Sequence, residues 1–240
     1  MWNAHNSASY MIDNDILIDV PNGTCKNLFR MDIEPKSINN ILITHFHGDH
    51  YFDIPFYFLL KTKDENKNVN IFCSKDGKKK IYNLTKLAFP KSTKSIFKSI
   101  NLKYGFSNSF KVNNYDVEKY IVDHGHMKPA YGYIIKSDNE KVGFTGDTSL
   151  CKTVEYMSKE CNYLFCDSMF IEGTDKHMGI DNLKYLSEKY KNCIYVVSHM
   201  EDDTRKKLEK LKIKNVIIPE DGDIIDIGNE LNTWKNYEKQ

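Results

Sequence analysis

The feature that most constrains this chain is a cluster of three histidines and one aspartate directly after an apolar run at residues 40–43. Neutral imidazole and carboxylate are ligands that suit zinc and its first-row neighbours. Alternate side chains of an extended segment share a face, and a turn at Gly48 can bring the later residues to the same point. The cluster therefore predicts a metal site, formed by His45, His47, Asp49 and His50.

Three later segments carry further ligand-type residues next to apolar runs. Residues 142–148 are a short apolar strand and a tight turn that ends near Asp147, and residues 194–199 are an apolar strand that ends at His199. The third segment, residues 122–133, offers two histidines, His124 and His126, on the same face. Histidines that recur at strand ends favour metal ligation over core packing.

The pattern His-x-His-x-Asp-His after a hydrophobic strand resembles the signature of the metallo-β-lactamase-fold hydrolase superfamily. The layout of the later motifs is most similar to the ribonuclease Z-like and small phosphodiesterase branch. The resemblance implies an α/β fold, the four-layered αβ/βα sandwich, and a single hydrolase domain over residues 1–240.

The resemblance also implies a ligand set for two divalent metal ions bridged by a hydroxide. It assigns His45, His47 and His126 to one ion, Asp49, His50 and His199 to the other, and Asp147 to both, while Asp49 orients the nucleophile. In the phosphodiesterase branches that the chain resembles, this ligand lies six residues before the glycine of a Gly-Tyr pair. Counting back from Gly132 favours His126, and His124 is the alternative. Zn²⁺ is the expected metal, with Mn²⁺ and Fe²⁺ as alternatives, since imidazole and carboxylate suit all three.

A second pair of residues resembles the proton-donating pair of ribonuclease Z. Asp167 follows the predicted strand at residues 162–166, and His177 precedes a helical pattern. A departing alkoxide needs a proton, and an imidazolium held by a carboxylate can supply it near neutral pH. We therefore expect His177 to be the general acid and Asp167 to be its partner. The alternative is that His177 only makes a local hydrogen bond at the start of the helix.

The charge distribution favours an anionic substrate. The whole chain carries a net charge of +1, whereas residues 61–111 hold thirteen lysines and only three acidic residues. Such a segment attracts polyanions, although it is equally expected of a solvated lysine-rich surface. The sequence predicts a phosphodiesterase for a nucleotide, a cyclic phosphate or a short nucleic acid. The alternative is a thioesterase or lactonase with the same metal centre.

Location is inferred from composition, and assembly is only what the resemblance implies. The N-terminus has neither the basic start nor the apolar core of a signal peptide, and no apolar run approaches a membrane span. Six cysteines without a C-x-x-C pair suit reduced thiols. We expect a cytoplasmic enzyme without a membrane partner, and a homodimer, as is common for small members of the family.

Periodicity predicts the main elements. Residues 10–12 and 16–20 form an opening hairpin, and residues 54–60 form a buried helix after the metal motif. Residues 78–84 have the pattern of an amphipathic helix. Helices are also expected near residues 149–160, 180–190 and 202–211, each leading to a strand.

Overall fold

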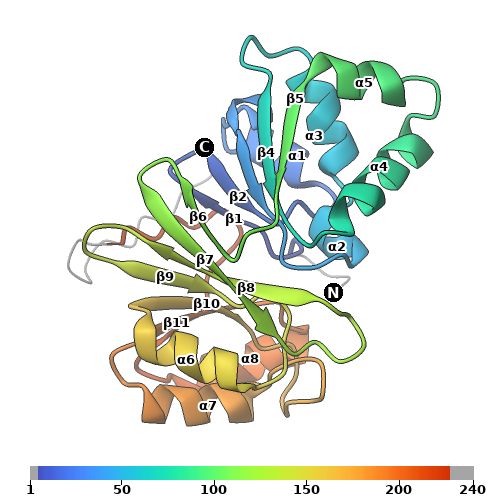
Figure 1. The fold of residues 1–240 in the computed structure, drawn as a ribbon. Coiled ribbons are helices and arrows are strands. Elements are labelled where there is room, and N and C mark those ends of the chain that lie inside the picture. The colour runs from blue at the N-terminus through green and yellow to red at the C-terminus, as the bar shows by residue number, and fades with distance from the viewer. Residues whose placement is uncertain (1–4, 228–240) are drawn as a thin grey trace. The chain divides into compact units, whose positions relative to one another are not determined.

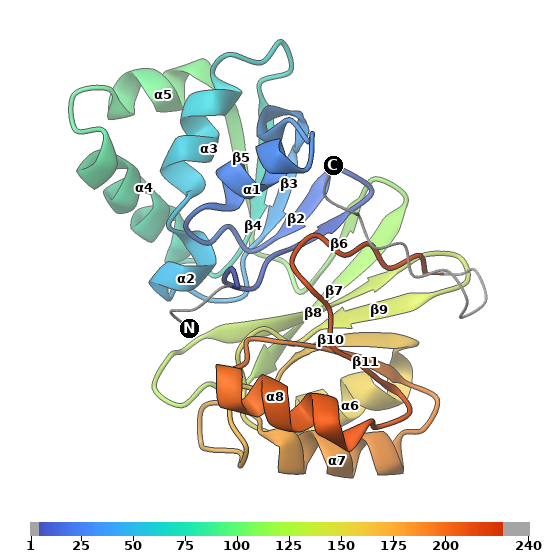
Figure 2. The same cartoon turned by 180° about the vertical axis from the view of Figure 1, so that it is seen from behind.

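The structure is a computed structural model that describes residues 5–227. The chain divides into two compact units, each with its own sheet and core (Figures 1 and 2). Among the described residues, the N-terminal unit is Ser7–Ser107, and the C-terminal unit comprises residues 5–6 and 108–227. The prediction of a single domain over residues 1–240 includes residues 1–4 and 228–240, which lie outside the described part.

The N-terminal unit contains a five-stranded sheet in the order β1-β2-β3-β4-β5. Only β1 and β2 pair antiparallel, and the other neighbours are parallel. The strands are β1 (Tyr10–Ile12), β2 (Ile16–Ile18), β3 (Asn40–Leu42), β4 (Asn68–Phe72) and β5 (Asn101–Gly105). The helical elements are α1 (Thr24–Arg30), η1 (Pro35–Ser37), α2 (Gly48–Tyr51), α3 (Ile54–Lys61), α4 (Gly77–Ala88) and α5 (Thr93–Ser99).

Burial of apolar side chains in the core accounts for the strands and helices of this unit. Every residue of β2 and β3 is buried, as is typical of parallel strands covered by helices. Helix α4 buries Gly77, Ile81 and Thr85, which recur every four residues and face one side. Helices α3, α4 and α5 lie together on one side of the sheet (Figure 1). The predicted hairpin and helices are confirmed here, although Phe56 in α3 remains 51% exposed.

The C-terminal unit contains a seven-stranded sheet in the order β12-β11-β10-β9-β8-β7-β6. Strands β9 to β12 are parallel, and β6 to β9 are antiparallel. The strands are β6 (Ser109–Val112), β7 (Tyr115–Val122), β8 (Ala130–Lys136), β9 (Lys141–Phe144), β10 (Tyr163–Asp167), β11 (Ile194–Ser198) and β12 (Val216–Ile217). The helices are α6 (Lys152–Glu160), α7 (Ile180–Lys189) and α8 (Asp202–Leu211), which confirms the predicted positions.

Helices α6, α7 and α8 lie on the same side of this sheet in both ribbon views (Figures 1 and 2). Their buried side chains, such as Val154, Leu183 and Leu208, share one cluster with Leu164 of β10 and Tyr195 of β11. The burial of these apolar side chains holds the helices against the parallel strands. The carboxyl ends of β9, β10 and β11 are therefore fixed side by side, because the three strands are hydrogen-bonded neighbours.

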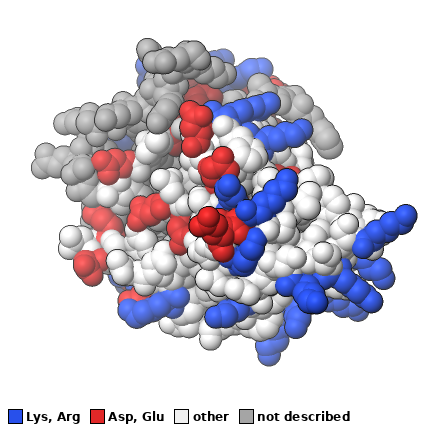
Figure 3. Space-filling view, turned by 90° about the horizontal axis from the view of Figure 1, so that it is seen from above, with Lys and Arg blue, Asp and Glu red and all other residues white. Residues whose placement is uncertain are grey.

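The lysines of the N-terminal unit are mostly solvent-exposed. Lys61 is the clear exception, because its ammonium group is buried and lies 2.8 Å from an Asp64 carboxylate oxygen. Within residues 75–98, which we call the lysine-rich segment, seven lysines are exposed. They are Lys75, Lys78, Lys79, Lys86, Lys91, Lys94 and Lys98. Figure 3 shows basic side chains gathered on the right of the view, where Figure 1 places α4 and α5.

Within residues 5–227, no helix has both the length and the apolar composition needed to cross a membrane.

Candidate metal and catalytic residues

The first histidine cluster lies where β3 ends and α2 begins. The ring centroids of His45 and His50 are 4.0 Å apart, and His45 Nε2 lies 3.0 Å from His47 Nδ1. Asp49 and His50 follow one another in α2, and their ligand atoms lie within 4.8 Å of each other. The N-terminal unit therefore brings together all four residues that the motif predicts.

Asp19, which the sequence pattern gives no role, organises this cluster. Its Oδ2 lies 2.7 Å from His50 Nδ1, and it accepts a 2.6 Å hydrogen bond from the Thr44 hydroxyl. The Thr44 backbone N–H donates to Asp19 Oδ1 at 2.8 Å. A carboxylate on one ring nitrogen fixes the orientation of a histidine and directs its other nitrogen toward a metal. Asp19 is therefore the orienting partner of His50.

The electrostatic and backbone state of Asp19 is unusual. Burial raises the pKa of its carboxyl above the ordinary value, while the contacts with His50 and Thr44 lower it. Its φ angle is +59°, in the left-handed region that few residues other than glycine, asparagine and aspartate occupy. A buried carboxyl in this conformation, directly after a strand, is the kind of local strain that gathers at functional sites.

The second group of residues lies at the carboxyl ends of the parallel strands in the C-terminal unit. Asp147 follows β9, Asp167 ends β10 and His199 follows β11. Two left-handed residues turn the chain at these ends, Gly146 with a φ of +60° and His199 with a φ of +54°. Glycine accepts this conformation without steric cost, so Gly146 allows the turn that presents Asp147. The carboxyl ends of parallel strands are the usual place for ligand sites in α/β sheets.

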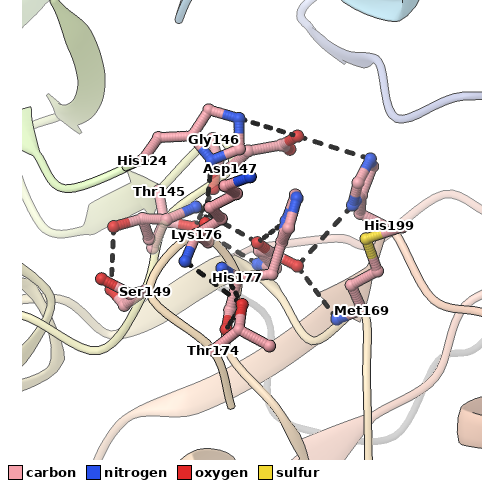
Figure 4. A network of polar contacts seen from close by, with 12 residues as sticks. His124, Thr145, Gly146, Asp147, Ser149, Met169, Thr174, Lys176, His177 and His199 are labelled. Atoms are coloured by element: carbon pink, nitrogen blue, oxygen red, sulfur yellow. Dashed lines mark hydrogen bonds and ion pairs between the residues drawn. The ribbon is translucent and has the colours of Figure 1, made fainter. Parts of the chain in front are cut away.

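These side chains converge with His177, which precedes α7 (Figure 4). One ligand atom from each of Asp147, Asp167, His177 and His199 lies within 4.8 Å of the others. His199 Nε2 lies 3.4 Å from Asp147 Oδ2, and His199 Nδ1 lies 3.7 Å from Asp167 Oδ1. The His177 and His199 rings are stacked with centroids 5.2 Å apart. Two carboxylates and two imidazoles thus share one small volume.

Asp167 and His177 form the pair that the sequence predicts. His177 Nδ1 lies 2.7 Å from Asp167 Oδ2. The same oxygen accepts a 3.1 Å hydrogen bond from the Thr148 backbone N–H, and Asp167 Oδ1 accepts one of 3.0 Å from the Met169 backbone N–H. Backbone donors therefore fix the carboxylate, which in turn fixes the tautomer and the direction of the His177 ring.

The structure places His124 and His126 differently. His124 is buried, and its Nε2 lies 3.9 Å from Asp147 Oδ2. Its Nδ1 lies 2.8 Å from the Lys176 carbonyl oxygen, which is a typical second partner of a metal-binding histidine. His126 is exposed and belongs to none of the potential metal-binding groups found among residues 5–227. The geometry therefore favours His124, the predicted alternative, over His126.

The donor chemistry fits divalent cations. The clusters in the two units consist of imidazole nitrogens and carboxylate oxygens, which are ligands of Zn²⁺ and its neighbours. His50 and His124 each have one ring nitrogen held by a protein oxygen. This arrangement leaves the other nitrogen in the form that binds a metal.

Comparison with solved structures identifies the fold. YhfI of Bacillus subtilis, a metallo-β-lactamase fold protein, matches with a TM-score of 0.71 at 17% identity, over 90% of this chain and 90% of that chain. A diphosphatase of the PhnP family matches with a TM-score of 0.69 at 20% identity, over 89% of this chain and 81% of that one. The predicted metallo-β-lactamase fold is confirmed.

The chain belongs to the family described as Anti-Pycsar protein Apyc1, whose model matches residues 4–218. Ribonuclease Z of Methanococcus maripaludis strain C5 is 31% identical over 158 residues, which are 60% of this chain and 48% of that protein. The chain spans about half the length of such curated relatives. The predicted relationship to ribonuclease Z is confirmed.

Proposed function

We propose that this chain is a metal-dependent phosphodiesterase that acts on a nucleotide, a cyclic phosphate or a short nucleic acid. The observation that carries the proposal is the Asp167–His177 pair, 2.7 Å between Oδ2 and Nδ1, beside Asp147 and His199. A carboxylate-held imidazole next to metal-ligand residues is suited to a reaction that needs both an electrophilic centre and a proton donor.

The ligand set in this proposal is His45, His47, Asp49, His50, His124, Asp147 and His199, with two divalent ions and Zn²⁺ expected first. Two bound ions lower the pKa of a water molecule and stabilise charge on the attacking and leaving oxygens. Asp49 is proposed to orient the attacking water. His124 takes the place that the sequence analysis gave first to His126, because of its distance to Asp147.

His177 is proposed to protonate the leaving group. Its Nδ1 is held by Asp167, so its Nε2 is the nitrogen available to carry a proton to the substrate. Water adds its oxygen to phosphorus and releases one proton to solvent, and the bond from phosphorus to the leaving oxygen breaks. The leaving oxygen takes the proton from Nε2, and His177 regains a proton from solvent. Proton transfer by a positioned side chain contributes about 10²–10⁴-fold to such a reaction.

The relatives support the same class of reaction. The curated relatives are named ribonuclease Z, and one solved structure of the same fold is a diphosphatase. Both names describe proteins that act on phosphate esters or anhydrides. Thioester or lactone hydrolysis is the second candidate, because a metal centre of this kind can polarise a carbonyl as well as a phosphoryl group.

Hydrolysis of bis-p-nitrophenyl phosphate by the purified chain tests the proposal, first with a chelator and then with Zn²⁺ or Mn²⁺ restored. We expect metal-dependent release of p-nitrophenolate, and no release from Asp147→Ala, which should also lose bound metal. Cyclic nucleotides and short RNAs then narrow the substrate. Retained metal without release of p-nitrophenolate, together with turnover of thioesters or lactones, would favour the second candidate.

We also propose that the chain works in the reducing cytoplasm. The six cysteines are all free thiols, and burial raises the pKa of Cys161 and of Cys193 to about 12. A thiol with so high a pKa forms little thiolate and resists oxidation. Thiol counting by mass spectrometry, after isolation without reductant, should find six free cysteines.

A homodimer is the proposed assembly. Large apolar side chains are exposed on α3 and α4, among them Phe56 at 51% and Leu87 at 82%. Exposed apolar side chains of this size are common at protein interfaces. Sedimentation equilibrium should give twice the chain mass of 28.0 kDa, and a monomer would refute the dimer without affecting the proposed reaction.

A further inference from the structure

The turn that carries His177 is held mainly by one hydroxyl group, that of Thr174. The Thr174 Oγ1 accepts hydrogen bonds from the backbone N–H groups of Lys176 at 3.2 Å and His177 at 3.0 Å. The Thr174 backbone N–H donates to the His177 carbonyl oxygen at 2.8 Å, and the Thr174 hydroxyl donates to the same oxygen at 3.4 Å. Residues 174–177 are thus closed on themselves by four hydrogen bonds, three of which depend on the threonine side chain.

Two imidazoles depend on this turn. His177 is the last residue of the turn, and its ring nitrogen Nδ1 contacts Asp167. The carbonyl of Lys176, one residue earlier, lies 2.8 Å from His124 Nδ1. The two rings also contact each other edge to face, with centroids 4.8 Å apart. A shift of the turn would therefore move the proposed proton donor and loosen the orientation of a proposed metal ligand at the same time.

The facing turn at residues 124–126 leaves little freedom to compensate. Gly125 has a φ of +56°, and a Cβ atom at this position would lie 2.8 Å from Lys176 Cγ and 3.6 Å from the Asp175 carbonyl oxygen. The two turns are in direct contact, so the position of the Thr174 turn is transmitted to His124 through packing as well as through the hydrogen bond (Figure 4).

We propose that Thr174 is a positioning residue, which through its hydroxyl holds His177 in line with Asp167 and the Lys176 carbonyl on His124. The expected effect on ester hydrolysis rests on the proposed function, whereas the expected effect on the positions of His177 and His124 does not. Groups that hydrogen-bond to catalytic residues or metal ligands commonly change activity or metal affinity by about 10–100-fold. Thr174 itself touches neither the substrate nor the metal in this proposal.

The kinetic test compares two esters that differ in their need for a proton. Thr174→Val removes the hydroxyl at nearly constant shape, and Thr174→Ser restores it. Diphenyl phosphate has the poorer leaving group, so its hydrolysis depends more on the proton donor. We expect Thr174→Val to slow hydrolysis of diphenyl phosphate about 10–100-fold and that of bis-p-nitrophenyl phosphate much less. Thr174→Ser should recover the rate. Both rates are measured with excess metal, so that a weaker hold on His124 lowers neither of them. An equal loss on both esters would then overturn the inference, since it indicates general damage.

Thr153→Val is the matched control. The Thr153 hydroxyl donates to the Ile121 carbonyl at 2.7 Å from α6, and it has no part in the proposed site. We expect this variant to retain the wild-type ratio of rates for the two esters.

A second readout needs no turnover. An imidazole N–H held by a carboxylate exchanges slowly, so wild-type protein without metal should show a low-field proton signal for His177 Nδ1–H, assigned by its absence in His177→Gln. We expect Thr174→Val to lose this signal and Thr174→Ser to keep it. Persistence of the signal in Thr174→Val would overturn the inference. If the wild type hydrolyses neither ester but the signal behaves as expected, the proposed function fails and the positioning role stands.

Discussion

At the scale of single residues, the most informative side chain is one that the motif does not contain. Asp19 lies after β2, far in sequence from His50, yet its Oδ2 is 2.7 Å from the His50 ring. The sequence predicts it only as a residue within the strand at 16–20, whereas β2 ends at Ile18. Its role depends on a left-handed backbone and on a contact between distant residues, and neither follows from local periodicity.

Asp19→Asn should weaken metal binding by about 10–100-fold, because the amide cannot replace the carboxylate that orients His50. Asparagine tolerates a positive φ, so the backbone is expected to stay in place. Competition with a fluorescent zinc chelator measures the effect. Asp32→Asn is the control, since Asp32 is exposed and also has a positive φ, of +57°. Equal affinities for the two variants would show that Asp19 does not orient a ligand.

The choice between His124 and His126 is also settled by one substitution at each. We expect His124→Ala to lose bound metal, because its Nε2 lies 3.9 Å from Asp147 Oδ2. The exposed His126 should be replaceable by alanine without a change in metal content. Elemental analysis of both purified variants gives the answer, and the opposite pattern would restore the assignment that sequence spacing favours.

These two histidines show where sequence spacing fails. They lie two residues apart in a segment that the pattern reads as extended, so both are expected on one face. In the structure Gly125 takes a positive φ between them, which breaks the alternation and sends the two rings to different surroundings. Asp147 and His199 keep the positions relative to strands that the sequence predicts, because Asp147 follows β9 after a two-residue turn and His199 directly follows β11.

At the scale of elements, the loop between β10 and α7 determines the position of His177. This loop returns on itself through hydrogen bonds from Ile180 N–H to the Phe170 carbonyl and from Thr174 N–H to the His177 carbonyl. The sequence predicts the strand before it and the helix after it. The path of the loop could not be predicted, because it depends on close backbone contacts rather than on periodicity.

Gly179→Ala tests the importance of that path. A Cβ atom at Gly179 would lie 2.4 Å from the Gly173 backbone nitrogen and 2.5 Å from the Glu172 carbonyl carbon. Backbone atoms cannot move aside as a flexible side chain can, so the loop must shift. We expect a loss of about 1–3 kcal/mol in the free energy of unfolding and slower ester hydrolysis.

Urea unfolding and bis-p-nitrophenyl phosphate hydrolysis measure these two effects. Lys184→Ala in α7 is the control, because Lys184 is exposed and lies on the helix rather than in the loop. Wild-type stability and activity in Gly179→Ala would mean that the loop adapts without moving His177.

At the scale of the whole molecule, charge asymmetry is the property that bears on the substrate. The chain as a whole has a net charge of +1, while the lysine-rich segment at residues 75–98 holds eight lysines and a single acidic residue, Asp76. Asp76 is paired with Lys80 at 2.8 Å, and the other seven lysines are exposed. This segment lies in the same unit as the first histidine cluster, since the Lys80 ammonium is 5.0 Å from the centre of the Phe46 ring.

If the substrate is a nucleic acid, exposed lysines of this segment should contact its phosphates. Lysine contacts to a single strand release counterions, and each contributes about 0.7 to the slope of log affinity against log salt concentration. The triple substitution of Lys78, Lys79 and Lys86 by glutamine should therefore weaken binding of a short RNA and lower that slope by about 2. Hydrolysis of bis-p-nitrophenyl phosphate should be unchanged, because that ester has only one phosphate group.

The matched control replaces Lys184, Lys206 and Lys207, which are exposed on α7 and α8, by glutamine. It changes the net charge by the same amount, so any effect of total charge appears in both triple variants. A loss of RNA affinity confined to the variant in the lysine-rich segment would favour a nucleic acid as substrate. Equal effects in both variants would mean that these lysines only solvate the surface, and would favour a nucleotide or a cyclic phosphate that needs no extended basic surface.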